Sequence, residues 1–165
     1  MNSINNSEPT RNLQSEREIT CSDQNIIKEA IGILESRIRK TEFLTRSTDV
    51  KRFCQLQIAE EKDEQFCCLF LDNQHRLITF ERLFRGTIDG ANVHPRVVVR
   101  RALELNSAAV ILAHNHPSGI TDPSQADISI TYRLKKALEY IDVRVLDHVI
   151  VGIEGTTSMA EVGSL

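Results

Sequence analysis

The chain has 165 residues, of which 41% are hydrophobic and 26% charged, and 20 basic against 23 acidic residues give a net charge of -3. This length suits one domain with a proper hydrophobic core and is short for two. The balanced charge gives no support to binding nucleic acid through bulk charge. No apolar run approaches the ~18 residues needed to span a membrane, and the N-terminus lacks the apolar segment of a signal peptide. We therefore expect a cytoplasmic protein with no membrane association.

The N-terminal part divides into a tail and a helix. Residues 1–22 are rich in Ser, Asn, Glu and Arg and almost free of large apolar groups, which predicts a disordered tail. Residues 23–44 follow as an N-terminal amphipathic helix, whose regular part runs from about 24 to 40 and can lie on the domain or pair with a partner. An oligomer would form through this helix. Its apolar residues recur at helical spacing: Ile27, Ala30, Ile31, Leu34 and Ile38.

Residues 45–165 form the main domain, in which strands and helices alternate. A second, shorter helix begins at Ser47 to Asp49, and a third begins at Pro95 and runs to about Asn106. Five segments have the apolar patterns of strands: 66–71, 77–84, 108–113, 143–151 and about 156–158. The first two are joined by a turn and form a hairpin, whereas 108–113 is a central strand buried on both faces. The sequence thus predicts an α/β fold with a mixed sheet flanked by helices.

The helix after the central strand is expected to begin at Asp122 and run to about Ile141. Asp122 and Pro123 suit its N-cap and first position, with Gln125 completing a capping box. The cysteines show no CxxC spacing, and Cys67 and Cys68 are adjacent in a strand and point to opposite faces. We expect small buried side chains in a reducing compartment rather than a metal site.

The chemistry lies in the pattern H-x-H-x(7)-S-x(2)-D, formed by His114, His116, Ser124 and Asp127. Residues two apart on an extended segment face the same side, so both histidines can point into one site at a strand end. Ser124 and Asp127 are three apart at a helix start and share a face. Two imidazoles and one carboxylate suit Zn²⁺ and leave the fourth tetrahedral position to water. We therefore predict one catalytic zinc per chain that hydrolyses an amide.

Such a site needs a base, and spacing alone does not identify it. The candidates are Glu60, Glu61, Glu64 and Glu81. Glu64 lies immediately before a core strand and can reach a site at the strand ends, whereas the others suit a solvated face. His148 beside Asp147 suggests a pair behind the ligands, but the two residues fall on opposite strand faces, so we interpret His148 as structural.

The pattern resembles the JAB/MPN (JAMM) zinc metalloprotease signature, and the wording HNHPSG resembles its RadC-like branch. The similarity covers roughly residues 45–163, including FRGT at 84–87, HPR at 94–96 and LDHVIVG at 146–152. Val97 follows HPR where the branch usually has Glu. The resemblance implies a deubiquitinase-like fold with zinc on His114, His116 and Asp127. It further implies an oxyanion-stabilising Ser124 and a general base at Glu64.

Three functions remain open at this point. The first is a metallopeptidase or isopeptidase that acts on a peptide or protein substrate. The second is a non-catalytic JAB/MPN binding module, since related domains include inactive scaffolds. The third is a DNA-associated RadC-like factor, although we expect a short form without the helix-hairpin-helix module of longer RadC-like proteins. The intact ligand set favours the first. The string HNH at residues 114–116 does not indicate an HNH nuclease, because the three letters of that motif name residues that are spread over a longer metal-binding finger.

Overall fold

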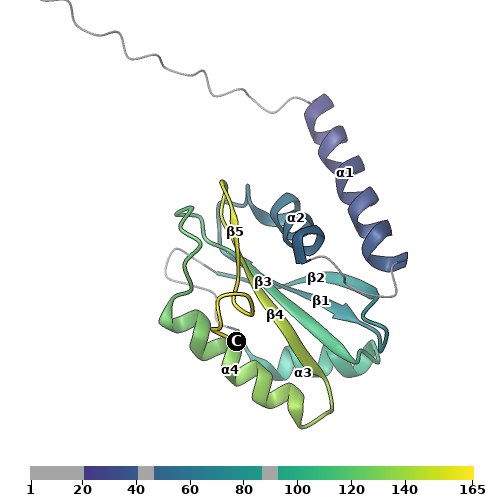
Figure 1. The fold of residues 1–165 in the computed structure, drawn as a ribbon, viewed down its shortest axis with the longest axis vertical. Coiled ribbons are helices and arrows are strands. Elements are labelled where there is room, and N and C mark those ends of the chain that lie inside the picture. The colour runs from purple at the N-terminus through teal and green to yellow at the C-terminus, as the bar shows by residue number, and fades with distance from the viewer. Residues whose placement is uncertain (1–20, 41–46, 87–92) are drawn as a thin grey trace, which may run out of the picture.

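The computed structural model describes residues 21–40, 47–86 and 93–165 (Figure 1). The expected disordered tail falls almost entirely outside these residues. The elements follow in the order α1 (Cys21–Lys40), α2 (Ser47–Ile58), β1 (Gln65–Leu71), β2 (Leu77–Arg85), α3 (Pro95–Glu104), β3 (Ala109–Asn115), α4 (Gln125–Glu139), β4 (Arg144–Val151) and β5 (Thr156–Ser158).

The five strands form one mixed sheet in the order β2-β1-β3-β4-β5. β3 pairs antiparallel with β1 and parallel with β4, and the crossover between the two parallel strands contains α4. The predicted hairpin is β1 and β2, joined through a turn in which His75 has a φ of 60°. The α/β class and the mixed sheet flanked by helices are confirmed.

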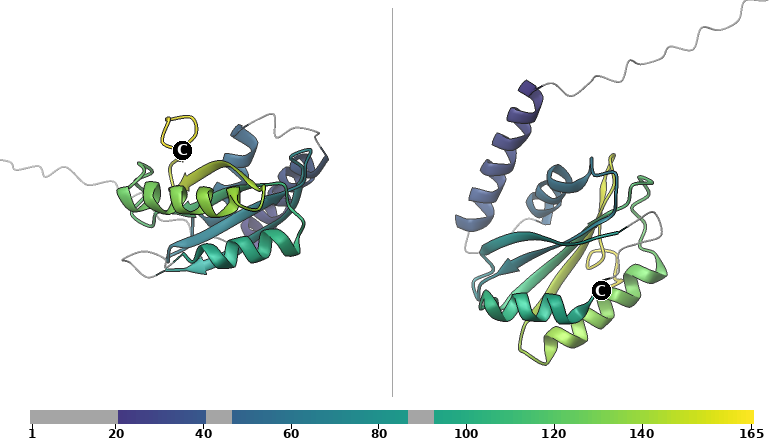
Figure 2. Two further views of the ribbon diagram at one scale, coloured as in Figure 1. Left: turned by 90° about the horizontal axis from the view of Figure 1, so that it is seen from below. Right: turned by 180° about the vertical axis from the view of Figure 1, so that it is seen from behind.

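Helices cover both faces of the sheet, as Figures 1 and 2 show. On one face α2 packs against the sheet through Phe53 and Ile58, and α1 adds Ile31 and Leu34 at the edge of this core. On the other face α3 and α4 bury Val98, Leu134 and Leu138 against the sheet. Because side chains alternate along a strand, β1 contributes to both cores. Cys67 belongs to the α2 face and Cys68 to the α4 face, as the sequence predicted.

The start of α4 differs from the prediction. The N-cap is Ser124 rather than Asp122, and the capping box joins Ser124 to Asp127 instead of joining Asp122 to Gln125. The Ser124 N–H donates to the Asp127 carboxylate at 2.7 Å, and the Asp127 N–H donates to the Ser124 hydroxyl at 3.1 Å. This reciprocal pair satisfies two N–H groups that the first helical turn leaves free. It also fixes the Asp127 side chain at the helix start.

α1 begins at Cys21, three residues before the predicted regular helix, and ends at Lys40. It packs against α2 and the edge strand β2. None of the helices within the described residues is long and apolar enough to cross a membrane.

Candidate metal centre

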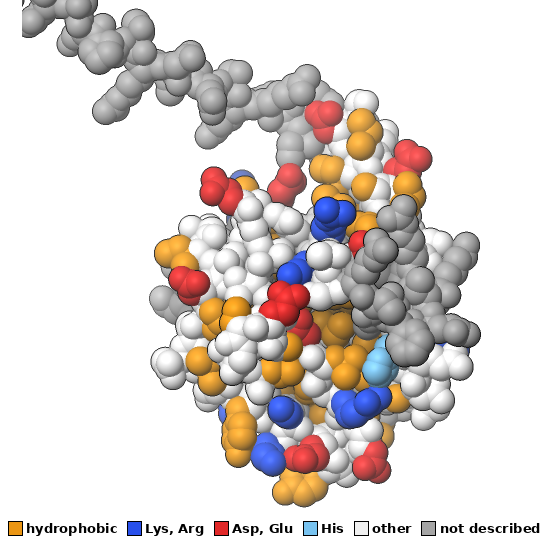
Figure 3. Space-filling view, in the orientation of Figure 1, with side chains coloured by type: hydrophobic (Ala, Val, Ile, Leu, Met, Phe, Trp, Pro, Cys, Tyr) orange, Lys and Arg blue, Asp and Glu red, His pale blue; other side chains and the backbone are white. Residues whose placement is uncertain are grey.

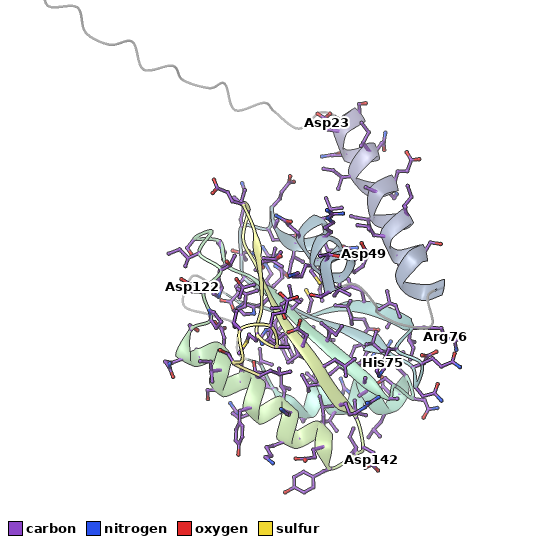
Figure 4. The ribbon with its side chains drawn as sticks, in the orientation of Figure 1. Asp23, Asp49, His75, Arg76, Asp122 and Asp142 are labelled. Atoms are coloured by element: carbon purple, nitrogen blue, oxygen red, sulfur yellow. The ribbon has the colours of Figure 1, made fainter. Side chains whose placement is uncertain are left out.

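The structure brings His114, His116 and Asp127 together at the carboxyl end of the central strand. His114 is the penultimate residue of β3, His116 follows the strand, and Asp127 lies in the first turn of α4. Figure 4 places Asp122, just before α4, at the opposite end of that helix from Asp142, so the centre lies at the helix N-terminus. The two Nε2 atoms are 2.8 Å apart. Asp127 oxygens lie 3.0 Å from Nε2 of His114 and 3.5 Å from Nε2 of His116.

These distances fit a divalent cation held by three protein donors. Zinc with ligands at about 2.0–2.2 Å in a tetrahedron sets neighbouring donors about 3.3–3.5 Å apart, and the observed separations are 2.8, 3.0 and 3.5 Å. Small outward movements of the side chains would therefore accommodate the ion. Within the described part of the chain, these three residues form the only His, Cys, Asp or Glu group with this property.

The loop after β3 sets the tautomer of His116. Its Nδ1 lies 2.6 Å from the carbonyl oxygen of Ile120, and because a carbonyl only accepts, Nδ1 carries the proton. In the neutral ring Nε2 therefore presents a lone pair toward the centre, as a metal ligand must. Gly119, with a φ of 83°, turns the chain so that Ile120 returns to His116.

The electrostatics of the centre favour an ionised carboxylate. Burial acts to raise the pKa of Asp127, but the close contacts of its carboxylate with the His114 and His116 rings outweigh it and bring the pKa far below its ordinary value. The hydrogen bond to Asp127 raises the pKa of His116, and the nearby charge of Glu64 adds to this effect. An anionic carboxylate beside two imidazoles is a donor set that can bind a divalent metal ion such as zinc.

Glu64 lies immediately before β1, in which Phe66 pairs with His114 of the central strand. Its charge acts on His116, and its carbonyl oxygen accepts a hydrogen bond from the Gly86 N–H at 2.8 Å. Two of the other candidate bases are held in ion pairs, since Glu61 pairs with Arg82 and Glu81 with Arg101. Of the four glutamates, Glu64 is the one whose charge raises the pKa of His116.

Asn115, between the two histidines, holds the segment that contains Glu64. Its side chain is buried, and its Oδ1 accepts a hydrogen bond from the Gln65 N–H at 2.7 Å. Its Nδ2 donates to the carbonyl oxygens of Glu61 at 3.1 Å and Asp63 at 3.3 Å. The chain on both sides of Glu64 is thus fixed to the strand that supplies His114. No sequence pattern indicated a role for Asn115, although a buried asparagine at the end of an apolar strand needs hydrogen-bond partners.

Ser124 is exposed at the rim of the centre. Its hydroxyl oxygen accepts the Asp127 N–H at 3.1 Å, which leaves its own proton available to an incoming group. The N-terminus of α4 also directs partial positive charge to this place. Ser124 therefore caps the helix and can still donate a hydrogen bond.

His148, which we interpreted from sequence as structural, lies directly behind His114. Its Nε2 is 2.8 Å from Nδ1 of His114. Burial lowers the pKa of His148 well below its ordinary value, so the ring is neutral. Asp147 faces the other way, as predicted, and accepts a hydrogen bond from the Ser158 hydroxyl at 2.6 Å. The contact between His148 and His114 depends on strand register, in which Leu112 pairs with His148, and the sequence pattern does not contain that information.

Comparison with known proteins agrees with this geometry. Residues 44–164 match the family model described as RadC-like JAB domain. A protein named UPF0758 protein from Nitrosococcus oceani is 55% identical over 132 residues, which cover 80% of this chain and 59% of that protein. A UPF0758 protein from Vibrio cholerae serotype O1 is 51% identical over 143 residues, covering 87% of this chain and 90% of that protein. The chain thus spans about three fifths of the Nitrosococcus relative, and neither name states an activity.

Proposed function

Because the chain belongs to the RadC-like JAB domain family, we propose that it is a zinc-dependent hydrolase that cleaves an amide bond in a peptide or protein substrate. One observation supports this proposal most strongly: ligand atoms of His114, His116 and Asp127, from a strand end and a helix start, lie within 4.8 Å of one another. Glu64 lies close enough for its charge to act on one of these ligands.

The donor set favours a catalytic rather than a structural zinc. Structural zinc sites are closed by four protein ligands, whereas three protein ligands leave a position open. Among the residues that the structure describes, three converge here. Zinc bound at this place would polarise a substrate carbonyl and lower the pKa of a water molecule toward neutrality.

The surrounding side chains fit the remaining tasks of amide hydrolysis. Glu64 is the proposed general base: its carboxylate would take a proton from the attacking water and deliver it to the leaving nitrogen. Ser124 would donate a hydrogen bond to the oxygen on which negative charge develops. The N-terminus of α4 would favour the same charge. Each task thus falls to a group that the fold holds at the strand ends or the helix start.

The charge distribution on one face of the molecule does not favour a nucleic-acid substrate. Figure 3 shows acidic and basic side chains interspersed over the face that it displays. This face of the described residues offers no continuous basic surface of the kind that tracks a phosphate backbone. We therefore propose a peptide or protein as the substrate class.

The proposal is tested with zinc-loaded protein and two libraries of quenched fluorescent peptides, one linked through main-chain amides and one through a lysine side chain. We expect hydrolysis of at least one library and a fall of about 10²- to 10⁴-fold in Glu64→Gln, the range for a lost general base. Zinc content should stay at the wild-type value in that variant. Glu60→Gln, at an exposed position four residues earlier in the chain, is the matched control and should keep full activity.

Two results would overturn the proposal. Undiminished hydrolysis by Glu64→Gln would remove Glu64 as the base. Stoichiometric zinc without turnover of either library would instead identify a binding module of the same fold.

A further inference from the structure

Two buried residues, His148 on β4 and Thr131 on α4, lie between His114 and Asp127. His148 is 0% exposed and Thr131 is 2% exposed. His148 Nε2 lies 2.8 Å from His114 Nδ1, and His148 Nδ1 lies 2.6 Å from the Thr131 hydroxyl. The Thr131 hydroxyl in turn lies 2.5 Å from the main-chain carbonyl oxygen of Asp127. A continuous series of hydrogen bonds thus joins two of the proposed metal ligands through the interior.

The donor and acceptor in each of these hydrogen bonds can be assigned by starting from the main-chain carbonyl oxygen of Asp127, which can only accept. A carbonyl oxygen has no proton to give, so the Thr131 hydroxyl donates to Asp127. The sulfur of Met159, 3.7 Å from the same hydroxyl, is a much weaker competitor. With its single proton committed, the hydroxyl accepts from His148, and the proton of that ring is therefore on Nδ1.

The tautomer of His148 in turn determines which nitrogen of His114 carries a proton. The two hydrogen-bond partners of His148 are a hydroxyl and a second imidazole, neither of which carries a negative charge, so the fully buried ring has one proton. With that proton on Nδ1, its Nε2 can only accept. Nδ1 of His114 must donate, which in the neutral ring leaves Nε2 of His114 as a lone pair directed at Asp127 and His116.

We propose that His148 and Thr131 are positioning residues, which form a one-way hydrogen-bond chain that holds His114 in its metal-binding tautomer and couples its ring to the backbone of Asp127. The inference rests on the proposed metal site, because the tautomer has a consequence only if a metal binds. It also explains why a histidine and a threonine occupy an otherwise apolar region between α4 and the sheet. Groups behind metal-binding histidines fix ring orientation and raise ligand basicity in this way.

Isosteric variants separate this role from simple filling of the core. Thr131→Val keeps the shape of the side chain but loses both the donor and the acceptor, whereas Thr131→Ser keeps the hydroxyl. Ser107→Ala is the matched control, since Ser107 is also a buried hydroxyl that donates to a main-chain carbonyl, at 3.2 Å, but lies before the opposite end of β3.

The first measurement is zinc affinity by competition with a chromophoric chelator, together with the free energy of unfolding of the chelator-treated protein. We expect Thr131→Val to weaken zinc binding by about 10- to 100-fold, the range for lost partners behind a ligand. Thr131→Ser should bind zinc nearly as the wild type does, and Ser107→Ala should change stability without changing zinc affinity. Wild-type affinity in Thr131→Val, or an equal loss in Ser107→Ala, would overturn the inference.

The second measurement needs neither zinc nor a variant. Long-range ¹H–¹⁵N correlation spectra of the ¹⁵N-labelled, chelator-treated wild type report the tautomer of each imidazole. The chain predicts protons on Nδ1 of both His148 and His114. A proton on Nε2 of His148 would reverse the direction and overturn the inference. Failure of the wild type to bind zinc, with these tautomers in place, would instead refute the proposed function.

Discussion

Gly152, directly after β4, offers a sharp test of how the loop at residues 117–122 supports the metal centre. A Cβ added at Gly152 would lie 2.5 Å from the carbonyl oxygen of Gly119 and 2.9 Å from the Thr121 side chain. The first contact is with backbone, so it cannot be relieved by rotating a side chain. Ordinary van der Waals separation is about 3.5 Å, and the loop would have to move by roughly 1 Å.

That movement would reach the metal ligand directly. Gly119 precedes Ile120, whose carbonyl oxygen fixes Nδ1 of His116 at 2.6 Å. We expect Gly152→Ala to lower the free energy of unfolding by about 1–3 kcal/mol, the usual cost of overpacking. Because the support of His116 is displaced, zinc affinity should also fall by about tenfold or more.

The same hairpin supplies the control. Gly155 would place a Cβ with nothing within 4 Å, so Gly155→Ala adds the same methyl group without a clash. Both variants are compared with the wild type by urea unfolding of the chelator-treated protein and by chelator competition for zinc. Equal behaviour of the two variants, or a destabilised Gly152→Ala with unchanged zinc affinity, would refute the reasoning.

Three further predictions follow from the centre. Asn115→Asp keeps an acceptor but loses both donated bonds around Glu64, so hydrolysis should fall much more than zinc affinity; unchanged turnover would contradict the positioning of Glu64. The hydrogen bond to Asp127 raises the pKa of His116. At pH values below that pKa, zinc must displace a proton from the His116 ring, so the zinc affinity measured by calorimetry should rise with pH and level off above the pKa. Affinity that stays flat from about pH 6 to 8 would count against this. Ser124→Ala should cost about 1 kcal/mol as a lost cap and reduce kcat by about 10²- to 10³-fold; a loss of stability alone would reduce Ser124 to a capping residue.

Local sequence patterns predicted most of the fold because the patterns and the tertiary structure agree. The apolar run before His114 became a central strand, and the turn residues after β1 closed the expected hairpin. The same local logic brought His114, His116 and Asp127 together, since a strand end and a following helix start meet at one edge of a sheet. Each of these features is determined by residues that lie close together in the sequence.

The features that sequence reasoning missed depend on contacts between distant segments. Alternation assigned His148 to one face of its strand, but its contact with His114 depends on the register between β3 and β4. Asn115 acquires its partners from a segment about fifty residues earlier. The predicted N-cap of α4 was wrong because both Asp122 and Ser124 suit an N-cap when only the local sequence is considered. The hydrogen bonds with Asp127, whose carboxylate also faces the histidines, select Ser124.

The central claim is that His114, His116 and Asp127 form a zinc site, and zinc titration of the chelator-treated protein tests it most directly. Asp127→Asn removes the anionic donor while keeping an oxygen that can accept the Ser124 N–H, so the helix cap survives. Asp122→Asn, in the loop before α4 (Figure 4), is the control. We predict one tightly bound zinc per chain for the wild type and Asp122→Asn and none for Asp127→Asn. Absence of stoichiometric zinc in the wild type, or its retention by Asp127→Asn, would contradict the account.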